Sequence, residues 1–202
     1  MKIASRLSPE EFHILAEEAL FNIIQSLLTG KEPFIYSGEG PFREEVEERF
    51  IIGDVCAFML EERIFRAVSR AADAVGDHFL LYSVVRALEG GVENNTWKVP
   101  LFDYEGYEMP TLDRGARGIP LEQVLYSPSG EWAIISDDDF ALVGGSLKFA
   151  TYLRHEYPEW REGLVEFLDK FRVAAQKPNV DVSWVQPLLR HLYGDGAPEF
   201  EV

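Results

Sequence analysis

Residues 131–145 have the sequence EWAIISDDDFALVGG, which is the clearest indication of the fold class. Two apolar runs, 132–136 and 140–143, lie on either side of the aspartates at 137–139. Apolar runs of this length around a short polar turn are typical of a β-hairpin, and the first run is apolar enough for burial on both faces of a sheet. We therefore predict two paired strands around Trp132.

The neighbouring residues extend this hairpin in both directions. Residues 124–126 suit a third strand, because the Ser, Pro and Gly residues of 127–130 have a turn composition. On the other side, the glycines at 144–145 permit an abrupt change of direction. Ser146 is then suited to cap a helix over 147–156.

The remainder of the C-terminal half is predicted to contain two more helices and one irregular segment. The helices are expected from Pro158 to about residue 176 and over 183–193, where apolar residues recur at helical spacing. Residues 91–120 are rich in Gly, Pro, Asn and aromatic side chains. This composition fits short edge strands, an extended loop, or a linker between two halves.

Residues 1–90 show mainly helical periodicity. Residues 8–11 match a capping box with Pro at the first helical position, and an apolar stripe then continues towards Gly30. Further helical stripes occupy 41–75, with a break at Gly53-Asp54, and 78–88. This half is therefore predicted to be a cluster of about four helices.

These elements together predict a single α+β domain over residues 1–202. Its helical half is expected at 1–90, and its sheet and C-terminal helices at 91–202. The sheet is predicted to be small and antiparallel, at about 97–143, with the C-terminal helices packing on it.

Length and composition fit one globular domain, because 202 residues with 47% hydrophobic content can bury a substantial core. No charge-free apolar run approaches the ~20 residues that a membrane span needs. Residues 1–7 do not resemble a signal peptide, and the lone Cys56 forms no intrachain disulfide. These features predict a cytoplasmic protein without a membrane segment.

The net charge of −16 restricts the kind of partner. An acidic surface repels the phosphates of nucleic acids, so we expect no nucleic-acid binding. It attracts basic proteins and speeds their association. The alternative interpretation is that the charge serves solubility alone.

The sequence contains no complete catalytic, cofactor or metal pattern. Glu10 and His13 match the Glu-x-x-His pattern of di-iron bundles once, where two copies are needed. Residues 137–139 lack the spacing of a calcium loop, and the glycines at 144–145 lack the rest of a phosphate-binding loop. We therefore predict no cofactor and no metal, and we interpret these features as a helix face, a polar turn and a helix cap.

Aromatic and acidic residues alternate in the irregular segment. Rings at an interface can bury apolar area while carboxylates attract a basic partner. The alternative is that the same rings cover the sheet and complete the core. The candidate partner-binding residues are Trp97, Phe102, Asp103, Tyr104, Glu105, Tyr107, Asp137, Asp138 and Asp139.

Residues 126–136, followed by 140–145, resemble a segment of uncharacterised bacterial proteins. The segment is similar in kind to small acidic immunity proteins of bacterial toxin systems. This resemblance covers a small part of the chain and carries no site residues. It implies a bacterial protein that binds and neutralises a toxin domain.

Three functional hypotheses follow. The first is a non-enzymatic binding protein of immunity type that blocks a basic toxin or partner. The second is an enzyme of unrecognised type, whose carboxylates and histidine meet only in the folded chain, in a deep acidic pocket. The third is a scaffold or oligomeric protein with a large apolar surface patch.

Overall fold

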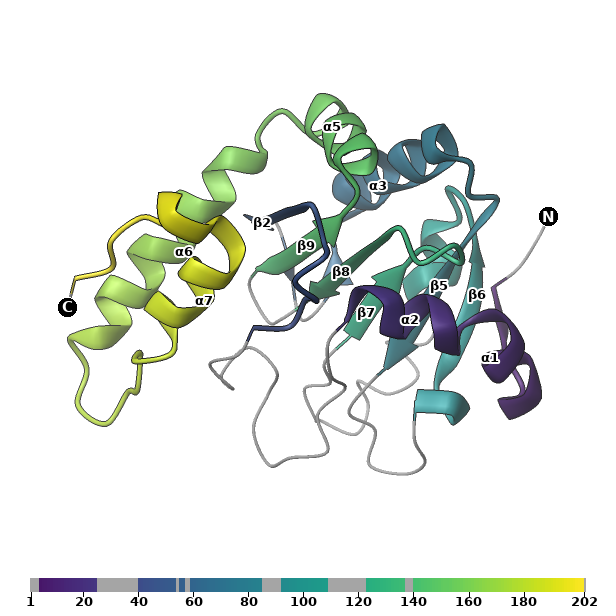
Figure 1. The fold of residues 1–202 in the computed structure, drawn as a ribbon, viewed down its shortest axis with the longest axis horizontal. Helices are drawn as coiled ribbons and strands as arrows, with labels where there is room; N and C mark the ends of the chain where they lie inside the picture. The colour runs from purple at the N-terminus through teal and green to yellow at the C-terminus, as the bar shows by residue number, and fades with distance from the viewer. Residues whose placement is uncertain are drawn as a thin grey trace.

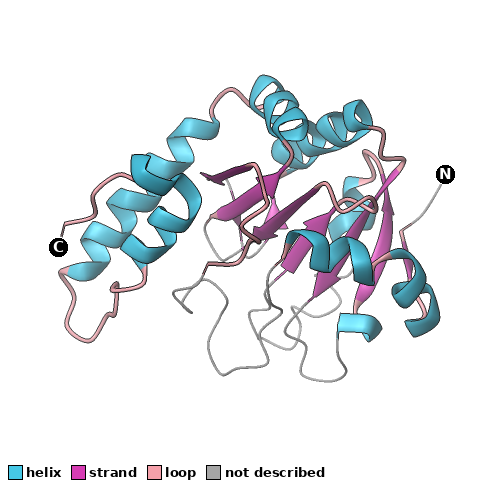
Figure 2. Cartoon of the chain, in the orientation of Figure 1, coloured by secondary structure: helices cyan, strands magenta, loops and turns pink. Residues whose placement is uncertain are grey.

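The computed structural model forms a sheet with helices on both faces (Figures 1 and 2). No helix among the residues it describes is long and apolar enough to cross a membrane. The described residues are 4–24, 40–53, 55–56, 59–84, 92–108, 123–136 and 140–201.

The sheet has seven strands in the order β1-β6-β5-β7-β8-β9-β2, and each neighbouring pair is antiparallel. A separate small sheet pairs β3 (Val55–Cys56) with β4 (Met59–Leu60). The strands of the large sheet are β1 (Ser5–Arg6), β2 (Glu48–Ile52), β5 (Phe79–Val84), β6 (Thr96–Pro100), β7 (Gln123–Tyr126), β8 (Trp132–Ser136) and β9 (Ala141–Gly145).

Side-chain alternation along the strands divides the core into two clusters. On β8, Trp132 and Ile134 belong to the cluster that contains α3 and α5, whereas Ala133 and Ile135 belong to the other. All four side chains are buried, which confirms that this strand is covered on both faces.

Helices cover each cluster in turn. One face carries α3 (Glu62–Val75) and α5 (Leu147–Glu156). The opposite face carries α1 (Pro9–Leu15), α2 (Glu17–Ile23), α6 (Trp160–Ala175) and α7 (Val185–Tyr193). Short 3-10 turns lie at η2 (Val92–Asn94) and η3 (Gly194–Gly196).

The predicted hairpin is confirmed. β8 pairs with β9 from Trp132–Gly145 to Ser136–Ala141, and β7 pairs with β8 on the other side. The aspartates at 137–139 lie outside the described residues. Ser146 caps α5 as predicted, since its hydroxyl accepts a hydrogen bond from the Phe149 amide (3.3 Å).

The capping box at the first helix is also confirmed. The Ser8 hydroxyl accepts from the Glu11 amide (3.2 Å), and the Glu11 carboxylate accepts from the Ser8 amide (2.8 Å). The helix is interrupted at Ala16, where φ is −126° and ψ is −35°, so that it divides into α1 and α2.

The predicted α+β class is confirmed, but the prediction that residues 1–90 form only a cluster of helices is wrong. β2 lies within the predicted 41–75 helical region, and the predicted helix at 78–88 begins instead as strand β5. Short apolar runs fit both a buried helix and a strand covered on both faces, and here β-branched and aromatic residues favour the strand. The sheet therefore extends beyond 97–143 and takes strands from both halves of the chain.

The C-terminal helices occur where they were predicted and pack on the sheet. α6 and α7 both contact β2, and α5 contacts β9. Within the irregular segment, β6 pairs with both β5 and β1, and residues 104–108 form a short helix. Residues 109–122 lie outside the described part of the chain.

Candidate functional site

The predicted aromatic residues separate into buried and exposed members along β6 and the short helix that follows it. Trp97 is half-buried on β6, with its ring 5.8 Å from that of Tyr82. The Arg6 guanidinium lies over the Trp97 ring at 5.6 Å. Trp97 thus joins β1, β5 and β6 at one edge of the sheet.

Tyr107 lies in the core. Its ring stacks on Phe65 at 4.8 Å and meets Tyr82 edge-on at 5.3 Å. Its hydroxyl accepts a hydrogen bond from the Leu60 amide (3.1 Å), and burial raises the pKa of the phenol. For Tyr107, therefore, the alternative prediction is correct: its ring completes the core.

Tyr104 lies between the core and solvent, in an acidic environment. Its hydroxyl donates to the Leu60 carbonyl (3.3 Å). Burial, together with the carboxylates of Glu108, Glu62 and Glu61, raises the pKa of Tyr104 to about 12. Three carboxylates from two different elements therefore act on one partly exposed phenol.

Phe102 is held outward in an unusual backbone conformation. Its side chain is 42% exposed, and its φ of 66° lies in the left-handed region. A bulky residue rarely adopts this region, because its Cβ approaches the carbonyl oxygen that follows. The Phe102 amide donates to the buried Ser69 hydroxyl (3.2 Å) on α3, which helps to hold the turn.

Asp103 begins the short helix that carries Tyr104. Its carboxylate accepts a hydrogen bond from the Gly106 amide (3.1 Å), and its carbonyl accepts from the Tyr107 amide (3.0 Å). Asp103 therefore has a structural role as a cap. Glu105 is exposed on the same turn.

We name the resulting patch the acidic aromatic surface. It consists of Tyr104 with the carboxylates that act on it, Glu61, Glu62 and Glu108, together with Phe102 and Glu105 from the same segment as Tyr104. Glu62 is also paired with Arg66 of α3 (2.6 Å). The sequence predicted Phe102, Tyr104 and Glu105 as partner-binding residues, and Glu108 lies in the same segment. It did not indicate Glu61 and Glu62, which lie at the start of α3.

A buried carboxylate that sequence reasoning missed lies beneath the hairpin. Asp77 accepts hydrogen bonds from the Ser127 hydroxyl (2.9 Å) and from the Trp132 indole nitrogen (2.8 Å). Burial raises the pKa of Asp77, although both hydrogen bonds oppose that shift. The two donors occupy one oxygen each, so this carboxylate joins α3 to the hairpin as a structural group.

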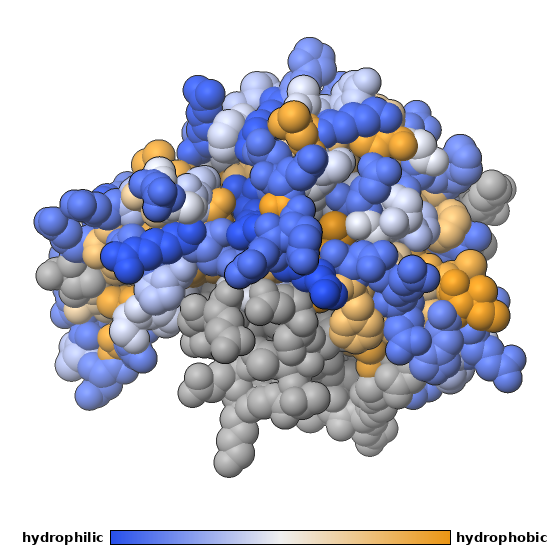
Figure 3. Space-filling view, viewed as in Figure 1, coloured by the Kyte–Doolittle hydropathy of each residue, from blue (hydrophilic) through white to orange (hydrophobic). Residues whose placement is uncertain are grey.

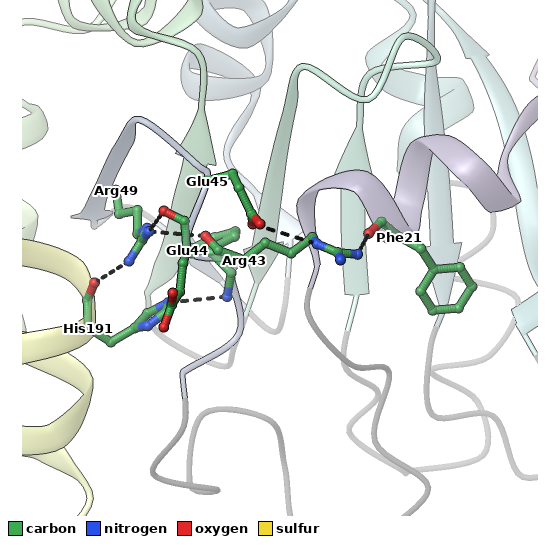
Figure 4. A network of polar contacts seen from close by, with 7 residues as sticks. Phe21, Arg43, Glu44, Glu45, Arg49 and His191 are labelled. Carbon is green, nitrogen blue, oxygen red and sulfur yellow. Dashed lines mark hydrogen bonds and ion pairs between the residues drawn. The ribbon is translucent and has the colours of Figure 1, made fainter.

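A second polar network joins α7 to the segment before β2 (Figure 4). His191 accepts a hydrogen bond from the Phe42 amide (3.2 Å), and Arg49 donates to the carbonyls of His191 (2.8 Å) and Arg43 (3.0 Å). Arg43 in turn donates to the Phe21 carbonyl (2.7 Å). Burial, with the nearby Arg49 charge, lowers the pKa of His191 to about 4, so the neutral ring serves as an acceptor within the fold.

The glycines before α5 have a packing role. A Cβ at Gly144 would lie 2.5 Å from the Phe42 ring, and one at Gly145 would lie 2.7 Å from the Trp132 Cβ. The carboxylate of Glu47 accepts from the Leu147 amide at the start of α5 (2.7 Å). The chain thus places its own anion where a phosphate would bind.

Among the described residues, no group of three or more His, Cys, Asp or Glu side chains is arranged to hold a metal ion. A cavity of about 400 Å³ lies beside α7 and η3, where Asp195 and Glu199 share the lining with Arg190. Its lining thus combines one cationic side chain with two carboxylates.

Comparison with family models, curated proteins and solved structures yields no match to this chain. The features of the molecule that bear on its function are therefore the acidic aromatic surface and the net charge of −16.

Proposed function

We propose that this protein is a non-enzymatic binding module of immunity type, which binds a basic toxin domain or other basic protein and blocks it sterically. The acidic aromatic surface is the contact region, and the bacterial cytoplasm is the proposed location. The observation that carries the proposal is Phe102, an exposed ring in a left-handed backbone two residues before Tyr104, on which several carboxylates act.

Backbone strain supports the choice of Phe102. A residue in the left-handed region costs of order 1–2 kcal/mol, and such conformations cluster at ligand-binding sites. Here the ring is presented to solvent and leaves much of its apolar area unused by the fold. Aromatic side chains, Phe among them, are enriched at the buried centre of protein–protein interfaces.

Charge supports the basic nature of the partner. The chain carries −16 overall, and Glu61, Glu62 and Glu108 act together on Tyr104. Carboxylates around an aromatic anchor speed the encounter with a cationic surface and disfavour anionic partners. This effect weakens as salt screens the charges.

Affinity capture with matched variants tests the proposal. Wild-type protein is immobilised and exposed to host lysate at about 50 mM and about 500 mM salt. We expect a basic partner at low salt, and a loss of about tenfold or more in its affinity with Phe102→Ala. Tyr152→Ala is the control, because Tyr152 is exposed to a similar extent (41%) but lies on α5.

Two results contradict the proposal. The first is the repeated absence of any basic partner at low salt. The second is a basic partner that Phe102→Ala and Tyr152→Ala retain equally, since the partner would then bind elsewhere.

A further inference from the structure

The edge of the sheet at β2 is covered by α7. β2 is an edge strand, because it lies at the end of the strand order and pairs with β9. The hydroxyl of Tyr193, at the end of α7, accepts a hydrogen bond from the Ile51 amide of β2 (3.1 Å). The same helix buries four apolar side chains in the adjoining core, at Val185, Leu188, Leu189 and Leu192. α7 therefore satisfies a backbone donor of an edge that could otherwise pair with another strand.

His191 joins α7 to the segment before β2 through a hydrogen-bond acceptor (Figure 4). Its ring nitrogen Nε2 accepts from the Phe42 amide (3.2 Å), and its ring stacks on that of Phe42, with centroids 6.3 Å apart and planes 14° apart. A Cβ at Gly40 would overlap the His191 ring, so the backbone also passes close to it. Because Nε2 accepts, the neutral ring carries its proton on Nδ1. A doubly protonated ring would direct an N–H group at the Phe42 N–H group, so this contact requires the neutral form.

Arg49 places a positive charge beside His191. Its guanidinium donates to the carbonyls of His191 (2.8 Å), Arg43 (3.0 Å) and Glu44 (2.7 Å). Glu45 is paired with Arg43 (3.8 Å), and the carboxylates of Glu44 and Glu45 both act on Arg49. The elements joined here carry further charged or titratable side chains at Glu47, Glu48, Arg190 and Tyr193. Of these groups, Arg49 is the one whose charge acts on the His191 ring, and it opposes a second positive charge there.

Protonation of His191 is therefore linked to the opening of α7. Burial, and then the charge of Arg49, lowers the pKa of the ring from its ordinary value of 6.5 to about 4. Above pH 6.5 the ring is neutral in both the closed and the open form, so the contact has its full strength. As the pH falls from 6.5 to about 4, only the open form gains the proton, and opening increases by up to about tenfold per pH unit. Hydrophilic side chains gather over β2, between the C-terminal helices and the rest of the sheet, so solvent lies close to this junction (Figure 3).

We propose that His191 is an acid-sensitive switch, which holds α7 on the edge strand β2 while its ring is neutral and allows α7 to open when the ring takes up a proton. Opening removes the Tyr193 hydroxyl from the Ile51 amide, so this edge of β2 becomes free to pair with an extended segment. The proposal is independent of the acidic aromatic surface, because neither α7 nor β2 contributes a residue to that surface.

Amide hydrogen exchange, followed by NMR at about pH 7 and about pH 5, tests the proposal. Division of each rate by the intrinsic rate at the same pH gives the equilibrium constant for opening. We expect opening at the α7 amides and at the Ile51 amide to increase by about tenfold or more at the lower pH. The Ile134 amide of β8 reports unfolding of the whole domain, and we expect it to open less often than α7 at both values.

Variants assign the response to His191. His191→Gln supplies an amide oxygen that can accept from the Phe42 amide but does not titrate, so its α7 amides are expected to open equally at the two pH values. The matched control, His155→Gln, alters an exposed histidine of α5 and is expected to keep the wild-type response. Asp77 is present in all three proteins, so its own titration cancels in the comparison.

Three outcomes overturn the proposal. These are α7 opening that does not change between the two pH values, a wild-type pH response that persists in His191→Gln, and equal opening of α7 and β8 amides at the lower pH. The first and third are measured on wild-type protein, so the test remains decisive if His191→Gln does not fold. None of them bears on capture through Phe102, so failure here is distinguishable from failure of the proposed function.

Discussion

Two aromatic regions pack against the same face of the sheet, but their aromatic side chains differ in exposure to solvent. In the hairpin, Trp132 is fully buried and stacks on Phe149 with ring centroids 4.4 Å apart and planes 4° apart. In the segment after β6, Tyr107 is equally buried, but the chain then places Tyr104 at the boundary and Phe102 in solvent.

Their polar atoms differ in the same way. The Trp132 indole nitrogen and the Ser127 hydroxyl satisfy both oxygens of Asp77, inside the protein. Around Tyr104, burial and then the nearby carboxylates raise the pKa of a phenol that remains partly exposed. The hairpin therefore uses its aromatic and acidic residues to stabilise the fold. In the acidic aromatic surface, by contrast, Phe102 remains 42% exposed and Glu62 is paired with Arg66 (2.6 Å) near solvent.

The largest expected effect comes from the hairpin. Trp132→Ala removes a fully buried ring and its stacking on Phe149, so we expect a loss of about 3–5 kcal/mol in the free energy of unfolding. Urea denaturation followed by circular dichroism measures this loss.

Trp132→Phe separates packing from hydrogen bonding. It keeps an aromatic ring but leaves one oxygen of Asp77 without its donor. We therefore expect Trp132→Phe to lower the free energy of unfolding by about 1–3 kcal/mol relative to wild type. A Trp132→Phe protein as stable as wild type would show that the indole hydrogen bond does not support the fold.

The hairpin was predictable because its signals are local. Two apolar runs, a polar turn and a Gly-Gly-Ser junction determine β8, β9 and the start of α5 within about twenty residues. β2 and β5 were missed for the opposite reason. Their apolar runs are covered by helices from distant parts of the chain, and a short run does not reveal that cover.

The candidate surface was predictable in composition but not in exposure. Phe102 and Tyr107 lie five residues apart and belong to the same aromatic segment, yet only the topology places Tyr107 against Phe65 and leaves Phe102 in solvent. Similarly, no local sequence pattern connects Asp77 with Trp132, because the two residues are far apart in the sequence. They form a hydrogen bond only once the chain has folded.

An intermediate effect is expected for Asp77, and it depends on pH. Burial raises the pKa of Asp77 above its ordinary value of 3.8, so the folded protein binds this proton more tightly than the unfolded chain does. This contribution to stability is present below pH 3.8, falls as the pH rises through the folded pKa, and is absent above it. Asp77→Asn lacks the titrating carboxyl group, so its free energy of unfolding lacks this pH-dependent contribution.

Urea denaturation from about pH 3.5 to about pH 7 measures the difference in unfolding free energy between wild type and Asp77→Asn. We expect wild type to lose stability relative to the variant as the pH rises. Asp73→Asn, which removes an exposed carboxylate from the last turn of α3 shortly before Asp77, controls for the loss of one charge. A wild-type minus Asp77→Asn difference that is constant across this range would contradict the effect of burial on Asp77.

The smallest expected effect on stability is at Phe102, where the comparison is sharpest. Asn adopts the left-handed region at low cost, whereas Ala bears much the same backbone cost as Phe. Phe102→Asn is therefore expected to be more stable than Phe102→Ala by about 1 kcal/mol, while both variants lose the ring that the proposed partner contacts. Equal stability of the two variants would show that the backbone there is not strained. A loss in both as large as that of Trp132→Phe would mean that Phe102 serves the fold as Trp132 does, and the distinction between the two aromatic regions would fail.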